Sequence, residues 1–186
     1  MAALESVLPH GGGEDGTREP IGFGFSLRDG RPTDLDFIEA SWVENLRWTS
    51  PQTRGVDSSI YFPRQRALIH KLLSRSAVIC AVDPESSDII WGYLVFEIAS
   101  PLVVHFVYVK RDFRSWLWEQ PPGSPGHYIR QVGKGGIAKS LFCAAAQTTD
   151  YEETPAVVTA YTDGLGTILR TRKNRVVVDP YLLHEL

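Results

Sequence analysis

The sequence predicts a single domain of the mixed α/β class, in which a mostly antiparallel sheet is flanked by helices. The chain has 186 residues, of which 43% are hydrophobic and 22% charged, which suits one domain with a substantial core. Apolar strand-like runs gather between residues 77 and 110, and helical patterns lie on either side of them. The resulting order is β-α-α-β-β-β-α-β-α-β, which is not a regular alternation of strands and helices.

The first strand is expected at residues 22–28, where apolar residues alternate, and the first helix at residues 31–48. Thr33 can cap this helix, with Asp36 three residues later in an approximate capping box. The side chains expected to form its buried stripe recur at helical spacing and are Leu35, Ile38, Trp42 and Leu46.

A second helix is expected at residues 60–76, with Pro63 in its first turn, where proline is tolerated. Two strands, 77–83 and 89–99, are joined by "PESSD", whose residues are typical of a hairpin turn. Residues 101–110 are mostly apolar, as in a central strand covered on both faces. The remaining elements are an Ala-rich helix at 136–149, a strand at 156–162, a short helix at 163–173 and a final strand at 175–183.

Composition excludes several classes of function. The net charge is −3 and the pI about 5.9, so no basic field predicts nucleic-acid binding. Cys80 and Cys143 lie in apolar runs, which favours buried thiols in a reducing compartment over a disulfide or a metal site. No apolar run has the length of a membrane span. Residues 1–22 are rich in Gly, Pro and charge and predict a flexible lead-in to a domain at 23–186.

The order of elements, together with "VYVKRDFR" and "GGIAKSLF", resembles the GNAT family of acyl-CoA-dependent N-acetyltransferases. In that family a strand ending in V-x-P-x-x-R is followed at once by a glycine-rich turn and a helix. The likeness runs over roughly residues 23–183 and is interrupted once, by an inserted loop at about 115–135. It also extends, more weakly, to acetyltransferase-like proteins encoded by tailed bacteriophages.

The resemblance implies acetyl-CoA as a co-substrate and no metal. The pyrophosphate of acetyl-CoA would lie at the N-terminus of the helix expected at 136–149, where backbone N–H groups and the helix dipole attract anions. Its pantetheine arm would pair with the backbone of the preceding strand, where an N–H can also stabilise an oxyanion. The residues implied to bind it are Val107, Tyr108, Val109, Arg114, Gly133, Lys134, Gly135, Gly136, Ile137 and Ala138.

Two registers of the phosphate loop are open. Aligning on "GGIAKSLF" places Gly136 and Ala138 in the glycine positions and keeps the apolar spacing of the helix, so we prefer it. Aligning on "RQVGKG" uses Arg130, Gly133 and Gly135 and starts the helix two or three residues late. A flexible loop before a helix, with no cofactor, is the alternative to both.

Acetyl transfer to an amine needs a base, and Glu97 and His105 are the candidates. By strand alternation His105 shares a face with Val103 and Val107, and a hydrogen-bonded core histidine is the alternative role. Glu97 can equally be a surface carboxylate. The resemblance implies that a tyrosine in the helix after the next strand would serve as the acid, but this sequence has no tyrosine at that place. Tyr161, just before the helix, is the substitute candidate, and packing in the core is its alternative role.

The inserted segment carries Trp116, Trp118 and Tyr128 among many prolines and glycines. Its composition argues against a helix or a central strand, and its aromatic residues argue against plain disorder. Three interpretations are open: an interface for another protein chain or a second copy, a lid over a substrate, and an insertion without function.

Two functions follow. The first is an acetyl-CoA-dependent N-acetyltransferase acting on a small-molecule or protein amine in the cytoplasm, that of a bacterial host if the protein is phage-encoded. The second is a non-catalytic GNAT-fold module for binding or assembly, such as a phage virion component, that uses the inserted aromatic loop.

Overall fold

The computed structural model describes residues 24–114, 118–119, 127–130, 136–148, 156–159 and 176–179. The predicted flexible lead-in at 1–22 and the predicted helix at 163–173 lie outside these residues. In chain order the elements are β1 Gly24–Asp29, η1 Pro32–Asp34, α1 Leu35–Thr49, α2 Pro51–Arg54, α3 Ser58–Leu73, β2 Ala77–Val82, β3 Ile90–Glu97, β4 Val103–Val109, η2 Arg111–Phe113, β5 Trp118–Glu119, β6 His127–Arg130, α4 Ile137–Gln147, β7 Ala156–Val158 and β8 Val176–Val178.

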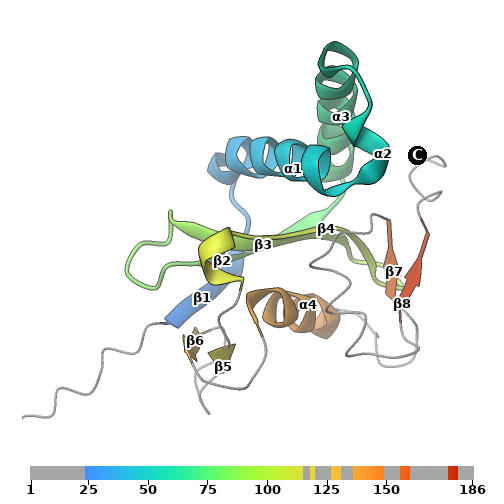
Figure 1. The fold of residues 1–186 in the computed structure, drawn as a ribbon. Coiled ribbons are helices and arrows are strands. Elements are labelled where there is room, and N and C mark those ends of the chain that lie inside the picture. The colour runs from blue at the N-terminus through green and yellow to red at the C-terminus, as the bar shows by residue number, and fades with distance from the viewer. Residues whose placement is uncertain are drawn as a thin grey trace, which may run out of the picture.

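The described strands form one sheet in the order β5-β6-β1-β2-β3-β4-β7-β8. Neighbours from β5 to β4 are antiparallel, whereas β4–β7 and β7–β8 are parallel. Helices α1 and α3 cover one face of the sheet, and α4 covers the other (Figure 1). This arrangement confirms the predicted mixed α/β class.

Two hydrophobic clusters, one on each face, hold the helices to the sheet. On the α1 and α3 face, the ring of Trp42 stacks on that of Phe106 with centroids 4.9 Å apart. On the other face, Leu141 and Phe142 of α4 are buried against the strands. Strand β4 contributes to both clusters, as expected of a central strand. Cys80 is buried in the first cluster, and burial raises the pKa of its thiol to about 12.

The start of the first helix differs from the expectation. Thr33 lies inside the short turn η1, and Asp34 occupies the N-cap position of α1 without a side-chain hydrogen bond to that helix; its carboxylate instead accepts a hydrogen bond from the Arg31 N–H at 2.7 Å, at the start of η1. Asp34 is available for this because Arg28 of β1 holds its carboxylate with two hydrogen bonds, at 2.7 and 3.0 Å. The hydrogen bond from Arg28 is also the main reason why the pKa of Asp34 is lowered. Arg28 of β1 thus holds the short turn that precedes the helix.

The other helical expectations hold in part. Ile38 and Trp42 are buried as predicted, whereas Leu35 is 42% exposed. Helix α3 begins at Ser58, earlier than expected, because Asp57 caps it by accepting a hydrogen bond from the Ser59 N–H. Its proline therefore lies in the second turn instead of the first.

The described part of the inserted segment contains neither a helix nor a central strand, in agreement with its proline and glycine content. Two short strands, β5 and β6, form a hairpin that extends the sheet beyond β1, with Gly24 opposite Ile129 and Trp118 opposite Arg130. Short strands at the edge of a sheet tolerate flanking proline and glycine because few ladder hydrogen bonds depend on them. The described part of the insertion thus lies at the opposite side of the sheet from β7. Within the described residues, no helix is long and apolar enough to cross a membrane.

We predict that Gly92→Ala destabilises the protein by about 1–3 kcal/mol in a chemical denaturation experiment. A Cβ at this position would lie 2.7 Å from the carbonyl oxygen of Tyr108 and 3.1 Å from Cγ2 of Ile137, so β4 and α4 would have to move. Gly55→Ala is the matched control, since no atom lies within 4 Å of the added group. Its free energy of unfolding should stay unchanged or rise by up to about 1 kcal/mol. Equal effects of the two substitutions would contradict this account of the β3–β4–α4 contact.

Candidate functional site

Strand β4 contains a bulge at His105. Phe96 of β3 lies opposite Val104, and the residue before it, Val95, lies opposite Phe106. No residue of β3 is therefore paired with His105 in the ladder. A bulge of this kind shifts the alternation of the strand by one residue. The expectation that His105 shares a face with Val107 by simple alternation is therefore wrong.

The bulge also changes which residues of β4 turn their backbone toward β7. Before it, the carbonyls of Leu102 and Val104 accept hydrogen bonds from Val157 and Thr159. After it, the Lys110 N–H donates to β3, at the Trp91 carbonyl. Because backbone groups alternate in direction along a strand, Val107 and Val109 then face away from β3.

The described pairing between β4 and β7 is short. It joins Val103 to Val157 and Val104 to Val158, and β4 continues for five residues beyond it. In this second half, Val107 and Val109 present their backbone on the β7 side of the strand. The Val109 carbonyl accepts a hydrogen bond from Arg114 Nε at 2.8 Å. Among the described residues, none pairs with the Val107 N–H and C=O or with the Val109 N–H on this side of β4.

Tyr108, between these valines, points its side chain to the opposite face of the sheet from α4. Its ring stacks on Tyr93 with centroids 5.3 Å apart and meets the edge of Phe37. Burial raises the pKa of its hydroxyl, against a smaller opposite effect of Arg114. Among the predicted cofactor residues, Tyr108 therefore contributes its backbone to the edge and its side chain to the core.

The first turn of α4 lies beside this half of β4. Gly136 is the N-cap, and its carbonyl accepts hydrogen bonds from the N–H groups of Lys139 and Ser140. No described side chain caps the helix, so the N–H groups of Ile137 and Ala138 point out of its end. The helix approaches β3 and β4 at Gly92, which lacks a side chain. This geometry agrees with the register that uses Gly136 and Ala138.

The alternative register does not agree with the fold. It places Arg130 in the phosphate loop, but Arg130 belongs to β6 and pairs with Trp118. Strands β1, β2 and β3 separate β6 from β4 in the sheet. The loop residues Gly133, Lys134 and Gly135 lie outside the described residues, as do Tyr161 and Trp116. Of Trp118 and Tyr128 the structure describes the backbone. Their proposed roles stay predictions.

The two candidate bases are in contact. His105 Nε2 lies 2.8 Å from Glu97 Oε1, and its Nδ1 lies 3.0 Å from Thr159 Oγ1. Arg75, just after α3, forms an ion pair with the same Oε1 at 2.6 Å. His105 is fully buried, whereas the Glu97 side chain is 25% exposed. Both earlier alternatives hold in part: His105 is a hydrogen-bonded core histidine, and Glu97 reaches solvent.

The environment of His105 favours its neutral form. Burial is the largest influence and lowers the pKa of the imidazole; the hydrogen bond to Glu97 opposes it, and the nearby Arg75 charge adds to it. A neutral histidine has one N–H donor and one acceptor nitrogen, which matches its two partners. Residues 97, 105 and 159 come from β3, β4 and the end of β7, so this cluster lies where the described pairing of β4 and β7 ends.

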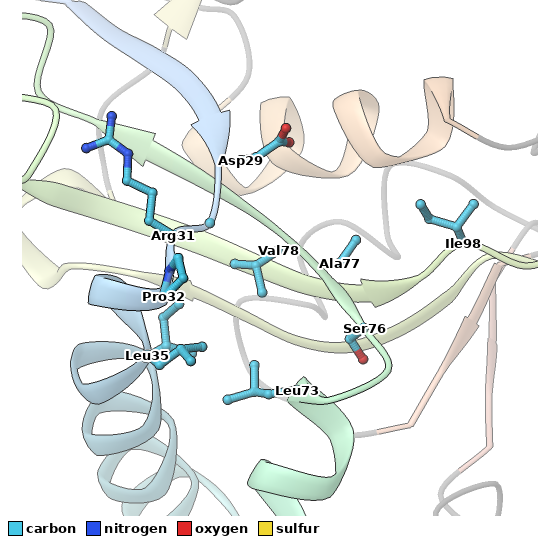
Figure 2. A pocket seen from close by; sticks show the side chains of 11 residues that line it. Asp29, Arg31, Pro32, Leu35, Leu73, Ser76, Ala77, Val78 and Ile98 are labelled. Atoms are coloured by element: carbon cyan, nitrogen blue, oxygen red, sulfur yellow. The ribbon is translucent and has the colours of Figure 1, made fainter.

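A groove of about 470 Å³ opens at the same end of β3, between the start of α1 and the end of α3. Figure 2 shows Leu35, Leu73 and Val78 around it, with Ile98 at one side. Its position explains why Leu35, expected in the buried stripe, is partly exposed. The Ser76 hydroxyl in its lining is buried and has no hydrogen-bond partner among the described residues.

Sequence reasoning missed several residues of this region. Gly92 had a local signal, since an isolated glycine in an apolar strand indicates a bulge or a close backbone approach. Lys139 also had one, as a cation in the first turn after the glycines. Arg75 and Thr159 had none, because only the folded sheet brings them to Glu97 and His105. Within the described part of the chain, no three His, Cys, Asp or Glu side chains form a group that could hold a metal ion.

The buried histidine predicts a pH dependence of stability. Below the unfolded-state pKa of about 6.5, the unfolded chain binds a proton at His105 that the folded protein does not, so stability falls as pH falls. This contribution is at most about 1.4 kcal/mol per pH unit. Between about pH 7 and pH 5, wild-type protein should lose more unfolding free energy than His105→Gln. The lowered pKa of Asp34 also stabilises the folded protein, but this contribution is lost only at lower pH and is the same in the wild type and in His105→Gln. If the unfolding free energies of the two proteins changed equally with pH, the conclusion that folding favours the neutral form of His105 would be refuted.

No protein-family model matches the sequence, and no curated protein does. Solved structures do. A candidate acetyl transferase from Pyrococcus furiosus matches at 14% identity over 83% of this chain and 97% of that chain, with a TM-score of 0.53. A GCN5-related N-acetyltransferase from Rhodopseudomonas palustris, also described as a class-II aminotransferase, matches at 16% identity over 80% of this chain and 79% of that chain, with a TM-score of 0.47. At such identities the likeness concerns the fold. The chain has the mixed α/β fold of GNAT acetyltransferases, as predicted.

Proposed function

We propose that this protein is an N-acetyltransferase that uses acetyl-CoA and acts on an amine. The observation that carries the proposal is the half-paired strand β4. Its pairing with β7 is described for two residues, after which the bulge at His105 turns the Val107 and Val109 backbone toward the β7 side. A strand edge with free backbone groups can bind an extended amide chain by adding it to the sheet. Pantetheine has two such amides.

The end of α4 fits the other part of this cofactor. Its first-turn N–H groups, at Ile137 and Ala138, and its dipole attract a pyrophosphate. Lys139 in the same turn is exposed and adds a positive charge. Gly92 lets this turn lie against β4, next to the edge that would hold pantetheine. Acetyl-CoA would supply the activated acetyl group there.

Glu97 supports the chemistry on the amine. A carboxylate attracts an ammonium group and can accept one of its protons, which leaves the nitrogen with the lone pair that acetylation needs. Glu97 is partly exposed, whereas His105 is buried with both ring nitrogens in hydrogen bonds. We therefore assign the base to Glu97. The role of Tyr161 as an acid stays a prediction, as do a phage origin and a cytoplasmic location.

A non-catalytic binding module is the second candidate. One observation favours it: both ring nitrogens of His105 and one carboxylate oxygen of Glu97 are engaged in a network with Thr159 and Arg75, as in a purely structural network. The β5–β6 hairpin would then supply the interface, by itself or with a second copy of the chain. Under this alternative the protein binds no acetyl-CoA.

Calorimetry with acetyl-CoA separates the two candidates. We expect the wild-type protein to bind with a Kd below about 1 mM. Lys139→Glu should weaken binding about tenfold, because it reverses a charge at the proposed pyrophosphate site. The substitution places an acid in the first turn of a helix, which favours folding, so a loss of structure does not explain the result.

Arg64→Glu is the control for charge. Arg64 is exposed on α3, on the opposite face of the sheet from α4, and its reversal should leave the Kd within about twofold of wild type. If both variants lost the same affinity for acetyl-CoA, the change in net charge would explain the loss and Lys139 would have no specific role. No binding to the wild-type protein at millimolar acetyl-CoA would sink the enzymatic proposal and favour the binding module.

A further inference from the structure

Four side chains from four different elements form one continuous polar chain across the sheet. Arg75 follows α3, Glu97 ends β3, His105 occupies the bulge of β4, and Thr159 follows β7. The links between them measure 2.6 Å from Arg75 Nη2 to Glu97 Oε1, 2.8 Å from there to His105 Nε2, and 3.0 Å from His105 Nδ1 to Thr159 Oγ1.

The chemistry of the partners determines where the hydrogens lie. An ionised carboxylate can only accept, so the proton between Glu97 and His105 belongs to Nε2 of His105. Burial lowers the pKa of His105 and so favours the neutral ring, and a neutral ring with its proton on Nε2 has an Nδ1 that accepts. The Thr159 hydroxyl is then the donor to Nδ1. Each link in the chain thus has one direction, from Thr159 to His105 to Glu97.

This direction leaves one atom available. Glu97 Oε1 accepts a hydrogen bond from His105 Nε2 and forms an ion pair with Arg75, while none of the described residues donates a hydrogen bond to Oε2. The Glu97 side chain is also the partly exposed end of the chain, next to the fully buried His105. The hydrogen bond from His105 and the ion pair with Arg75 both hold Oε1, which restricts the orientation of the carboxylate and therefore the direction of Oε2.

We infer that Arg75 and Thr159 are positioning residues for the proposed acetyl transfer, which orient Glu97 through its Oε1 so that Oε2 receives a proton from a primary amine. The inference rests on the proposed function. In the step itself, an N–H bond of the bound ammonium breaks, an O–H bond forms at Oε2, and the electron pair stays on nitrogen. His105 keeps its own proton throughout and acts through Glu97.

The parallel pairing of β7 makes Thr159 the sensitive member. Its N–H donates to the Val104 carbonyl at 3.0 Å, one residue before the bulge, so its hydroxyl reaches His105 only while the two strands are joined there. Thr159 thus links the junction of β4 and β7 to the orientation of the base. Arg75 provides the corresponding link from the end of α3.

Thr159→Val removes the hydroxyl with little change of shape, and Thr159→Ser restores it. Nitrogen NMR of His105 should find the proton on Nε2 and a hydrogen-bonded Nδ1 in wild type and Thr159→Ser, with the Nδ1 signal shifted in Thr159→Val. With a primary amine as acceptor, Thr159→Val should lower kcat about tenfold with an unchanged Kd for acetyl-CoA. Thr159→Ser should recover most of that loss. Thr148→Val, the same chemical change at the end of α4, should behave as wild type.

Two outcomes overturn the inference alone: a wild-type His105 that carries its proton on Nδ1, and a Thr159→Val variant that keeps wild-type kcat in a protein that binds acetyl-CoA. Arg75→Gln gives an independent arm, and it should lower kcat more than Arg75→Lys, which keeps the charge next to Oε1. A wild-type protein that binds no acetyl-CoA overturns the proposed function and this inference with it. The NMR result is independent of activity, so the two failures are distinguishable.

Discussion

The bulge at His105 is the constraint on which the rest of the site depends. One extra residue in β4 reverses the direction of every backbone group that follows it, so the strand pairs with β7 before the bulge and offers its edge after it. The side chain of His105, the bulged residue, departs from the alternation of faces along β4 and reaches Glu97 of β3 and Thr159, just after β7. Without the bulge, Tyr108 instead of Val107 and Val109 would turn its backbone to that edge.

The two faces of β4 pack against different helices. Below the sheet, α4 brings a helix N-terminus to the second half of the strand, because Gly92 removes the side chain that would hold it away. Above the sheet, α1 and α3 cover an aromatic layer that includes Trp42 and Phe106. Strand β4 therefore packs against the N-terminus of α4 on one face and carries His105, which contacts Glu97 of β3, on the other.

Local patterns predicted most of the fold and little of the site. The strands β2 to β4 and the start of α4 followed from apolar runs, turn residues and Gly136, which are properties of short segments. The helix cap was mispredicted because Arg28 on β1 holds Asp34, a contact that depends on the packing of two elements. For the same reason the bulge and the link from Arg75 to Glu97 had no signature. Each exists only once strands are paired in one register.

The β5–β6 hairpin has a consequence for how this chain can change. The excursion that contains it leaves the core after Phe113, whose ring stacks on Trp91, and returns at Ile137, which lies against Gly92. Both ends therefore meet the same short stretch of β3, and the hairpin in between extends the far side of the sheet. A segment anchored in this way is separable: it can lengthen, shorten or be exchanged while the strands that build the site keep their register.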